Sequence, residues 1–319
     1  MRLPLVKCHG SGNDFPLLDT RALRLDDRAW ARIAVALADR AGPVGGDGML
    51  LLTDGDGPER NGAAFGMRMF NADGSESEQC LNGLRCVARM GFARLGLNAA
   101  TVRLKTSAAQ VARAPDLAPG VYTVRETAGP ASLDVTRWPM AVGRSENIER
   151  PIAALPSPRA FTAVAMPNPH LVAFVDMIDE VELVAAGEAC EAAPAWLPNR
   201  ANVSFVESRG EDLFVRTFER GVGLTDSCGS AMAAATYAAC LTGRRAWARE
   251  LTVFNHGGLV RAAAAEDGMV TLAGNATWEW EGAVEVDAGG AVLGITIERR
   301  FEDEAAAWEA LKSSPGRSW

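Results

Sequence analysis

The chain has 319 residues, 48% of them hydrophobic and 23% charged, which is enough apolar material for one large folded domain or two ordinary ones. The net charge of −8 argues against a nucleic-acid partner, because phosphate binding requires a basic face. The N-terminus has no apolar segment typical of a signal peptide, and the longest apolar helical run, 231–241, is too short to cross a bilayer. We therefore expect a cytoplasmic protein with no membrane partner.

Cysteine, histidine and lysine usage limits the cofactor chemistry open to the chain. In a reducing compartment the six cysteines are expected to be free thiols, and none has C-x-x-C spacing. With only three histidines beside them, no metal site is expected. Lys7, Lys105 and Lys312 lie in no recognisable pyridoxal phosphate motif, so no cofactor is expected either.

The first half opens with an apolar strand, a glycine-rich turn and a second strand, LVKCHGSGNDFPLLD (5–19). A β-rich run follows at 45–52, and a strand is predicted at 67–70. This strand leads directly into FNADGSESEQCLNG (70–83), which ends in a cysteine followed by Leu-Asn-Gly.

A helix is predicted from Cys80 onward. Small or apolar residues recur at helical spacing, and Gly96 is in a suitable position to end the helix. The recurring residues are Leu84, Val87, Gly91 and Leu95. Strands are predicted after it at 102–107 and 121–126.

The second half repeats this order. FTAVAMPNPHLVAFVD (161–176) is again strand, turn and strand, and NRANVSFVE (199–207) is the matching β-rich run. A strand at 213–218 then leads into FERGVGLTDSCGS (218–230), where a second cysteine precedes Gly-Ser. The order of the blocks is the same as in the first half.

A second helix is predicted from Cys228 to Cys240, with Gly243 in the stopping position. Its side chains are so small that it could pack closely inside a surrounding sheet. Strands follow at 251–255 and 269–274. The tail at 301–319 is predicted to form one amphipathic helix and a frayed end, outside the repeated pattern.

Three matched blocks in the same order favour a duplicated domain of mixed α/β class, with 129–139 as the crossing between the halves.

In each half a thiol is predicted at a helix N-terminus, where partial positive charge favours the thiolate and free N–H groups can bind an anion. Two such sites suit proton exchange at a carbon next to a carboxylate. One thiolate removes a proton from one face, and the opposite thiol returns one to the other.

The remaining cysteines have a simpler interpretation. Free cysteine is commonly buried, so Cys8, Cys86, Cys190 and Cys240 are expected to fill the core. A redox pair of Cys80 and Cys228 is the main rival to acid–base chemistry. Their long separation and the lack of C-x-x-C spacing argue against it.

With these residues assembled, the chain resembles the diaminopimelate epimerase family of cofactor-independent two-cysteine enzymes. The matching motifs are KCHGSGNDF, GGDG, MRMFNADGSESEQCLNGLRC, PNPH, RANVSFVE and FERGVGLTDSCGS. The resemblance implies two pseudo-symmetric domains, each a mixed sheet or barrel around a central helix, with the site in the cleft between them. We expect 1–128 plus 275–287 in the first domain, 129–274 in the second and 288–319 as an extension.

The resemblance also implies the site residues. Cys80 and Cys228 are the expected acid–base pair. The helix-start N–H groups expected to hold the reacting carboxylate belong to Leu81, Asn82, Gly229 and Ser230, and the expected substrate contacts are Asn13, Asn71, Asn168 and Asn202. Arg220 is expected to pair with the substrate's distal carboxylate, while Glu219 and His170 bind ammonium or support the thiols. Asp47 and Asp73, each followed by glycine, are interpreted as turn formers.

Three departures from the family pattern lie near this site: Leu81 replaces a glycine, Leu224 a glutamate, and Pro167 a glycine. A positive φ at Leu81 would be strained.

The leading hypothesis is epimerisation of LL-diaminopimelate to the meso form, for lysine and peptidoglycan supply. The alternatives are a racemase of another amino acid, such as a histidine racemase, or a non-catalytic amino-acid binding homologue. The expected partner is a small amino-acid substrate, and a homodimer is left open.

Overall fold

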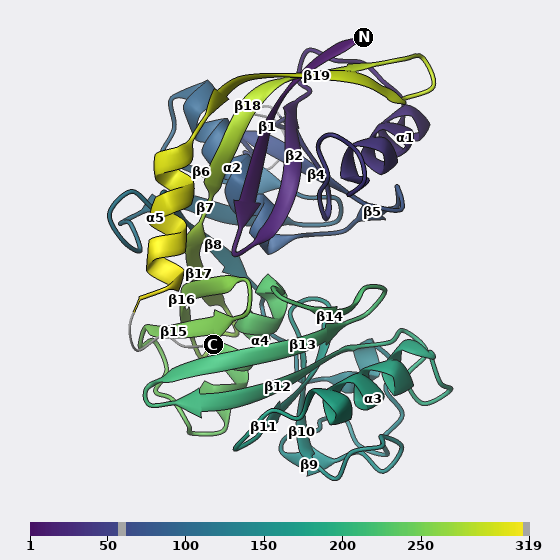
Figure 1. The fold of residues 1–319 in the computed structure, drawn as a ribbon. Helices are drawn as coiled ribbons and strands as arrows, with labels where there is room; N and C mark the ends of the chain where they lie inside the picture. The colour runs from purple at the N-terminus through teal and green to yellow at the C-terminus, as the bar shows by residue number, and fades with distance from the viewer. Residues whose placement is uncertain (57–61, 315–319) are drawn as a thin grey trace. The chain divides into compact units, whose positions relative to one another are not determined.

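The computed structural model describes residues 1–56 and 62–314 (Figure 1). The described residues fall into two compact units: unit 1 contains those within 1–126 and 273–314, and unit 2 contains Thr127–Leu272. Both units mix strands and helices, which confirms the predicted fold class. Within the described ranges, no helix is long and apolar enough to span a membrane.

Unit 1 is a sheet around a central helix. β1 pairs antiparallel with both β2 and β18, β2 runs parallel to β3, β3 antiparallel to β4, β4 parallel to β6, and β6 antiparallel to β7. The strands of this unit are β1 (Arg2–Gly10), β2 (Asn13–Asp19), β3 (Gly48–Asp54), β4 (Phe65–Asn71), β5 (Glu76–Ser77), β6 (Ala99–Arg103), β7 (Ala108–Ala114), β8 (Thr123–Ala128), β18 (Thr277–Val286) and β19 (Val292–Arg300).

The central helix of unit 1 is α2 (Leu81–Leu95), whose residues are buried from Leu81 through Phe92. It begins at the N-cap Cys80 and ends at Gly96, which takes the left-handed conformation with φ 67°, so both predicted ends are confirmed. A side chain at Gly91 would place its Cβ 2.5 Å from the ring of Phe65. The helix can therefore approach β4 closely only because this position is glycine.

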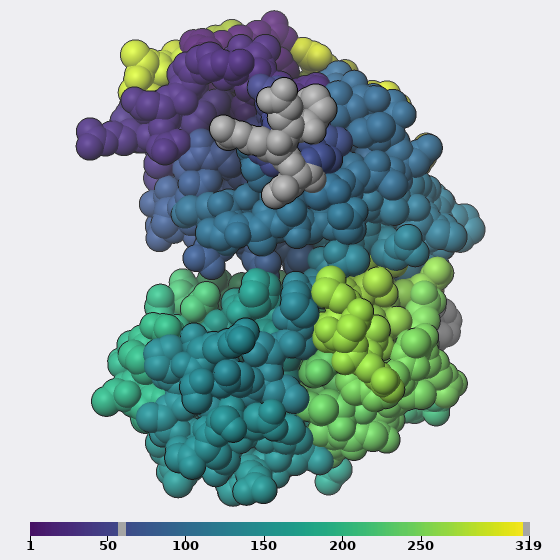
Figure 2. Space-filling model, turned by 180° about the vertical axis from the view of Figure 1, so that it is seen from behind, coloured from purple at the N-terminus to yellow at the C-terminus, as the bar shows by residue number. Residues whose placement is uncertain are grey.

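Two helices cover the outside of this sheet. α1 (Asp27–Ala38), capped by Asp26, packs Trp30, Ile33 and Leu37 into an apolar cluster with residues of β1, β3 and β18. The turn between β18 and β19 lies beside α1 in both views (Figures 1 and 2), where Arg32 Nε donates to the Gly289 carbonyl at 3.0 Å.

The predicted tail helix is present as α5 (Glu302–Lys312). It packs against β18, with its buried Trp308 beside the ring of His9, and Glu304 bonding to Arg89 of α2. β19 and α5 thus both form part of unit 1. The predicted frayed end at 315–319 lies outside the described residues.

Unit 2 repeats the strand order of unit 1. β10 and β11 are antiparallel, β11 and β12 parallel, β12 and β13 antiparallel, β13 and β15 parallel, and β15 and β16 antiparallel. The elements are β9 (Arg150–Pro151), β10 (Ala160–Ala165), β11 (Pro169–Phe174), β12 (Asn202–Arg209), β13 (Asp212–Glu219), β14 (Gly223–Thr225), β15 (Leu251–Asn255), β16 (Gly258–Ala264) and β17 (Val270–Asn275), with a 3₁₀ turn at Val135–Arg137. This is the same succession of pairings, so the predicted duplication is confirmed.

The helices of unit 2 match as well. α4 (Gly229–Leu241), the counterpart of α2, starts after its N-cap Cys228 and is buried through Cys240. α3 (Glu180–Glu191), the counterpart of α1, covers β12 and β13 from outside. The predicted strand at 102–107 is wrong beyond Arg103, because Leu104 turns back and donates its N–H to the carbonyl of Ser107.

Candidate active site

Cys80 is the N-cap of α2, and its sulfur replaces the oxygen of a usual capping side chain. Its Sγ accepts the backbone N–H of Gly83 at 3.4 Å, which satisfies one of the free donors of the first turn. The same sulfur lies 3.7 Å from Oδ1 of Asn13, which can accept the thiol proton. The Cys80 side chain is half-buried, so it is accessible from the surface of unit 1.

Cys228 occupies the equivalent N-cap of α4, but it is buried. Burial raises the pKa of its thiol well above the usual value, and the charge of Glu219 raises it further. The hydroxyl of Ser230, 3.5 Å from Sγ, and the N–H of Ala231 lower the pKa but do not offset these effects. The expectation that the helix start lowers this pKa is therefore wrong for Cys228, because removal from water outweighs the helix terminus.

Four predicted residues belong to unit 1, and three of them, Asn13, Leu81 and Asn82, lie around the start of α2. Asn13 begins β2, and Asn71 ends β4, donating to Ser75 Oγ at 2.9 Å. Leu81 is the first helical residue of α2, so the strain expected from a positive φ does not arise. Its side chain is buried, and its backbone N–H keeps the helix-start position. Asn82 is also buried, and its Oδ1 accepts from Arg85 at 2.8 Å.

Arg85 is a functional candidate that the sequence did not indicate. Its guanidinium, fully buried, donates to Glu126 at 2.7 Å, to the Asn275 carbonyl at 3.0 Å and to Ser11 Oγ at 3.0 Å, besides Asn82. Glu126 Oε2 is buried and has no hydrogen-bond partner among the described residues. Burial raises the pKa of Glu126 to about 7, although the charge of Arg85 and its hydrogen bond lower it. Arg85, held by its ion pair with Glu126, in turn fixes the Asn82 side chain through the hydrogen bond to Oδ1.

A chain of polar contacts in unit 2 ends at Cys228. His170 is fully buried, and burial together with the charge of Arg220 lowers its pKa to about 3, so the ring is neutral. Its Nε2 lies 3.1 Å from Oδ1 of Asn168 and is placed to donate to it. Asn168 Nδ2 donates to Ser230 Oγ at 3.2 Å. Because Ser230 accepts this bond, its own O–H is left to donate to Cys228.

The other predicted residues of unit 2 surround this chain. Asn202 Oδ1 accepts the backbone N–H of Arg220 at 2.9 Å, and the Arg220 guanidinium donates to the Asn199 carbonyl at 3.2 Å. Glu219 Oε2 accepts from Thr225 Oγ1 at 3.5 Å. Gly229 opens the first turn of α4 beside Cys228. Of the predicted residues of unit 2, Asn168, Gly229 and Ser230 therefore lie at the start of α4, and Glu219 is close enough for its charge to act on Cys228.

Two of the departures from the family pattern are also found in unit 2. Pro167 lies in the turn between β10 and β11, which Met166 closes by donating its N–H to the Asn168 carbonyl at 2.8 Å. Leu224, on β14, is exposed. Neither residue displaces Asn168 or Glu219 from the contacts described above.

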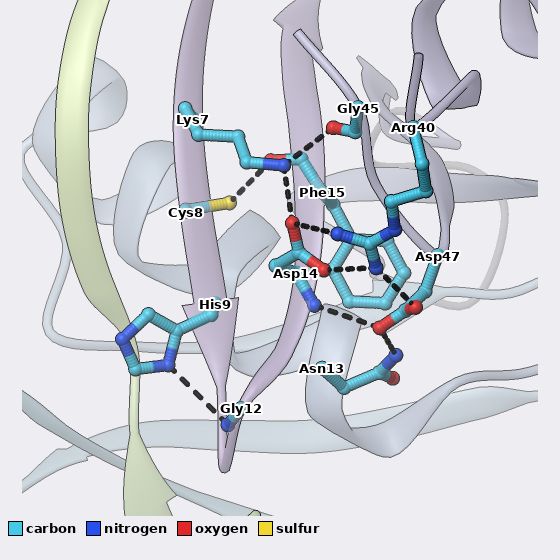
Figure 3. A network of polar contacts seen from close by, with 10 residues as sticks. All are labelled: Lys7, Cys8, His9, Gly12, Asn13, Asp14, Phe15, Arg40, Gly45 and Asp47. Carbon is cyan, nitrogen blue, oxygen red and sulfur yellow. Dashed lines mark hydrogen bonds and ion pairs between the residues drawn. The ribbon is translucent and has the colours of Figure 1, made fainter. Parts of the chain in front are cut away.

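The two Asp-Gly sequences behave differently. Asp73 accepts the N–H and hydroxyl of Ser75, as a turn former does. Asp47 instead binds Asn13 and Arg40 through its side chain (Figure 3), so its interpretation as a turn former alone is wrong. Arg40, Asp14 and Lys7 complete this network.

Solved structures share this fold. A predicted epimerase from Pseudomonas aeruginosa matches with a TM-score of 0.66 at 17% identity, over 89% of this chain and 100% of that one. A hydroxyproline epimerase from Agrobacterium vitis matches with a TM-score of 0.61 at 13% identity, over 98% of each chain. At these identities the comparison shows the fold alone. Other proteins with this fold include a probable proline racemase and a methylitaconate isomerase.

Sequence comparison then gives the family. The family model for diaminopimelate epimerase matches residues 5–114 and 162–279. The diaminopimelate epimerase of Clostridium acetobutylicum is 36% identical over 315 residues, 97% of this chain and 93% of the relative. That of Enterococcus faecalis is 37% identical over 317 residues, 95% of this chain and 96% of the relative. The chain belongs to the diaminopimelate epimerase family, and it is an isomerase.

Proposed function

We propose that the protein epimerises LL-diaminopimelate to meso-diaminopimelate in the cytoplasm, without a cofactor, and supplies lysine and peptidoglycan synthesis. The observation that carries this proposal is the cysteine at the N-cap position of the central helix of each unit, Cys80 on α2 and Cys228 on α4. Binding alone would not require two acid–base groups at two helix starts.

The reaction needs one thiolate and one thiol. The thiolate takes the α-proton and becomes a thiol, while the other thiol gives its proton to the opposite face and becomes the thiolate. The electron pair left on the α-carbon is delocalised onto the substrate carboxylate. The N–H groups of Leu81, Asn82, Gly229 and Ser230 are the proposed donors to that carboxylate. Atoms and charge balance, and the two cysteines exchange protonation states in each turnover.

The environment of Cys228 suits this exchange. Burial raises the pKa of the Cys228 thiol, so the thiolate left after proton donation is a strong base, able to take a proton from carbon in the reverse direction. The hydroxyl of Ser230, oriented by Asn168 and neutral His170, supplies a donor to that thiolate. Arg220 is the proposed partner of the distal carboxylate, through a bidentate ion pair.

A racemase of another amino acid is the second candidate, because Leu81, Pro167 and Leu224 replace residues usual in the family. Leu81 argues less strongly for it than the sequence implied, since this residue begins α2 with ordinary helical backbone. Retention of Arg220 favours a substrate with a distal carboxylate. The third candidate, a non-catalytic binding protein, does not account for a cysteine at the N-cap position of both central helices.

Hydrogen exchange in heavy water separates the three. Purified protein is incubated with diaminopimelate or with other amino acids, and α-deuterium is followed by NMR. Exchange with diaminopimelate supports the proposal, exchange only with another amino acid supports the racemase, and no exchange supports the binding protein. Cys80→Ala and Cys228→Ala are each expected to abolish turnover, and full activity in either would refute the two-thiol mechanism. Cys80→Ser retains an acceptor for the Gly83 N–H and controls for loss of the cap.

A further inference from the structure

Asp47 is attached firmly to β2 and also reaches the predicted substrate residue Asn13 (Figure 3). Its Oδ2 accepts from Asn13 Nδ2 at 2.5 Å and from the backbone N–H of Asp14 at 3.1 Å, and its Oδ1 accepts from Arg40 Nη2 at 2.5 Å. Its own backbone N–H donates to the Asp14 carbonyl at 2.8 Å. The position of the Asp47 carboxylate therefore does not depend on Asn13.

Charged groups from neighbouring elements hold this arrangement. Asp14 of β2 accepts from Arg40 at 2.6 and 3.1 Å and from Lys7 of β1, whose ammonium also donates to the Gly45 carbonyl at 2.5 Å. Burial alone would raise the pKa of Asp14, but the hydrogen bonds and charges of Arg40 and Lys7 lower it. Glu279 of β18 faces the same cations, and burial raises its pKa.

The partner of Asn13 fixes the direction of its amide. A carboxylate only accepts hydrogen bonds, so the amide nitrogen must face Asp47. The amide oxygen then faces Cys80, with Oδ1 3.7 Å from Sγ. A rotated amide would present its nitrogen to the sulfur and stabilise the thiolate instead. Asp47 thus selects between two orientations with opposite effects on Cys80.

We propose that Asp47 is a positioning residue for Cys80: it holds the Asn13 amide so that the sulfur meets an acceptor, which favours the thiol and makes the thiolate a stronger base. The inference rests on the proposed role of Cys80 as one of the two acid–base groups. In this role Asp47 contributes to proton transfer and does not only form a turn with Gly48.

The test is the pH dependence of Cys80 alkylation by iodoacetamide, followed by mass spectrometry. Trypsin releases Cys80 on the peptide 69–85, separate from Cys86, so the two thiols are measured independently. In Asp47→Ala the Asn13 amide loses the partner that orients it, and the midpoint for Cys80 is expected to fall by about one pH unit. Cys86, buried in α2, should remain slow to react and reports that the fold is intact.

Matched variants separate orientation from charge. Asp47→Asn removes the same charge but keeps an oxygen that can accept from Asn13, so its shift should be less than half as large. Asp116→Ala removes another arginine-paired carboxylate of similar exposure, 36% against 40% for the Asp47 side chain, and should cause no shift. Asn13→Ala removes the acceptor itself and should lower the midpoint, with no further effect of Asp47→Ala in that background.

Two results would overturn the proposal. One is an unchanged midpoint in Asp47→Ala while Asn13→Ala lowers it. The other is an equal shift in Asp47→Ala and Asp47→Asn, since charge alone would then be responsible. Alkylation does not require turnover, so either result is distinguishable from failure of the proposed epimerase activity.

Discussion

The buried pair of Arg85 and Glu126 makes the stability of the protein depend on pH. The pKa of Glu126 is raised from an ordinary value of 4.5 to about 7, because burial outweighs its attraction to Arg85. A folded-state pKa above the unfolded one means that the folded protein binds the extra proton. The contribution of this group to stability is therefore complete below pH 4.5 and is lost as pH rises through about 7.

The size of this effect follows from the shift. At 1.36 kcal/mol per pKa unit, a rise from 4.5 to about 7 corresponds to about 3 kcal/mol of unfolding free energy. Glu126→Gln keeps an oxygen for the 2.7 Å contact with Arg85 but cannot ionise. The difference in unfolding free energy, wild type minus variant, should thus decline by about 3 kcal/mol between pH 4.5 and pH 8.

Urea unfolding at intervals of pH, followed by circular dichroism, measures this difference. Glu298→Gln is the surface control: Glu298 pairs with Arg2, but their side chains are 55% and 60% exposed, and it should give a flat difference. A flat curve for Glu126→Gln would mean that Arg85 compensates burial completely. A rising curve would mean that the ion pair lowers the pKa of Glu126. Either result would refute the reasoning.

Two further predictions concern Cys228 and α5. Ser230→Ala removes the hydroxyl that lies 3.5 Å from the Cys228 sulfur, and it should move the midpoint of Cys228 alkylation to higher pH. Ser230→Thr keeps a hydroxyl and should restore the midpoint. An unchanged midpoint in Ser230→Ala would show that the hydroxyl does not donate to the sulfur. Trp308→Ala removes a buried side chain that anchors α5 beside His9 and should lower the unfolding free energy of unit 1 by about 3–5 kcal/mol in urea titration. Glu309→Ala on the exposed face of α5 is the matched control, and an equal loss in both variants would contradict this anchoring role.

The sequence predicts the duplicated framework well, because its signals are local. Both central helices begin at a cysteine after turn residues and end near glycine, and the structure places Cys80 and Cys228 at the two N-caps. Neither α1 nor α3 is among the predicted elements, although Asp26 and Asp179 are ordinary N-cap residues in front of them. β19 is absent from the prediction as well, since its mostly exposed residues give no clear alternation.

The supporting residues of the site could not be predicted in the same way. Arg85 stands in a helical run, where arginine normally faces solvent, and its partner Glu126 lies 41 positions away. Asp47 lies 34 positions from Asn13, and its sequence Asp-Gly is more often a turn. The burial that raises the pKa of Cys228 depends on the packing of the whole sheet around α4. These contacts exist only after the chain has folded.

The capping bond between Cys80 and Gly83 restricts how the reaction can proceed. A sulfur that accepts a backbone N–H of the first turn of its own helix cannot rotate toward a ligand without breaking that hydrogen bond. The position of the Cys80 sulfur is consequently fixed by the backbone, so the substrate must bind with its α-carbon next to it. New substrate specificity in this fold should then evolve through changes in the residues that bind the substrate, while the sulfur keeps its position.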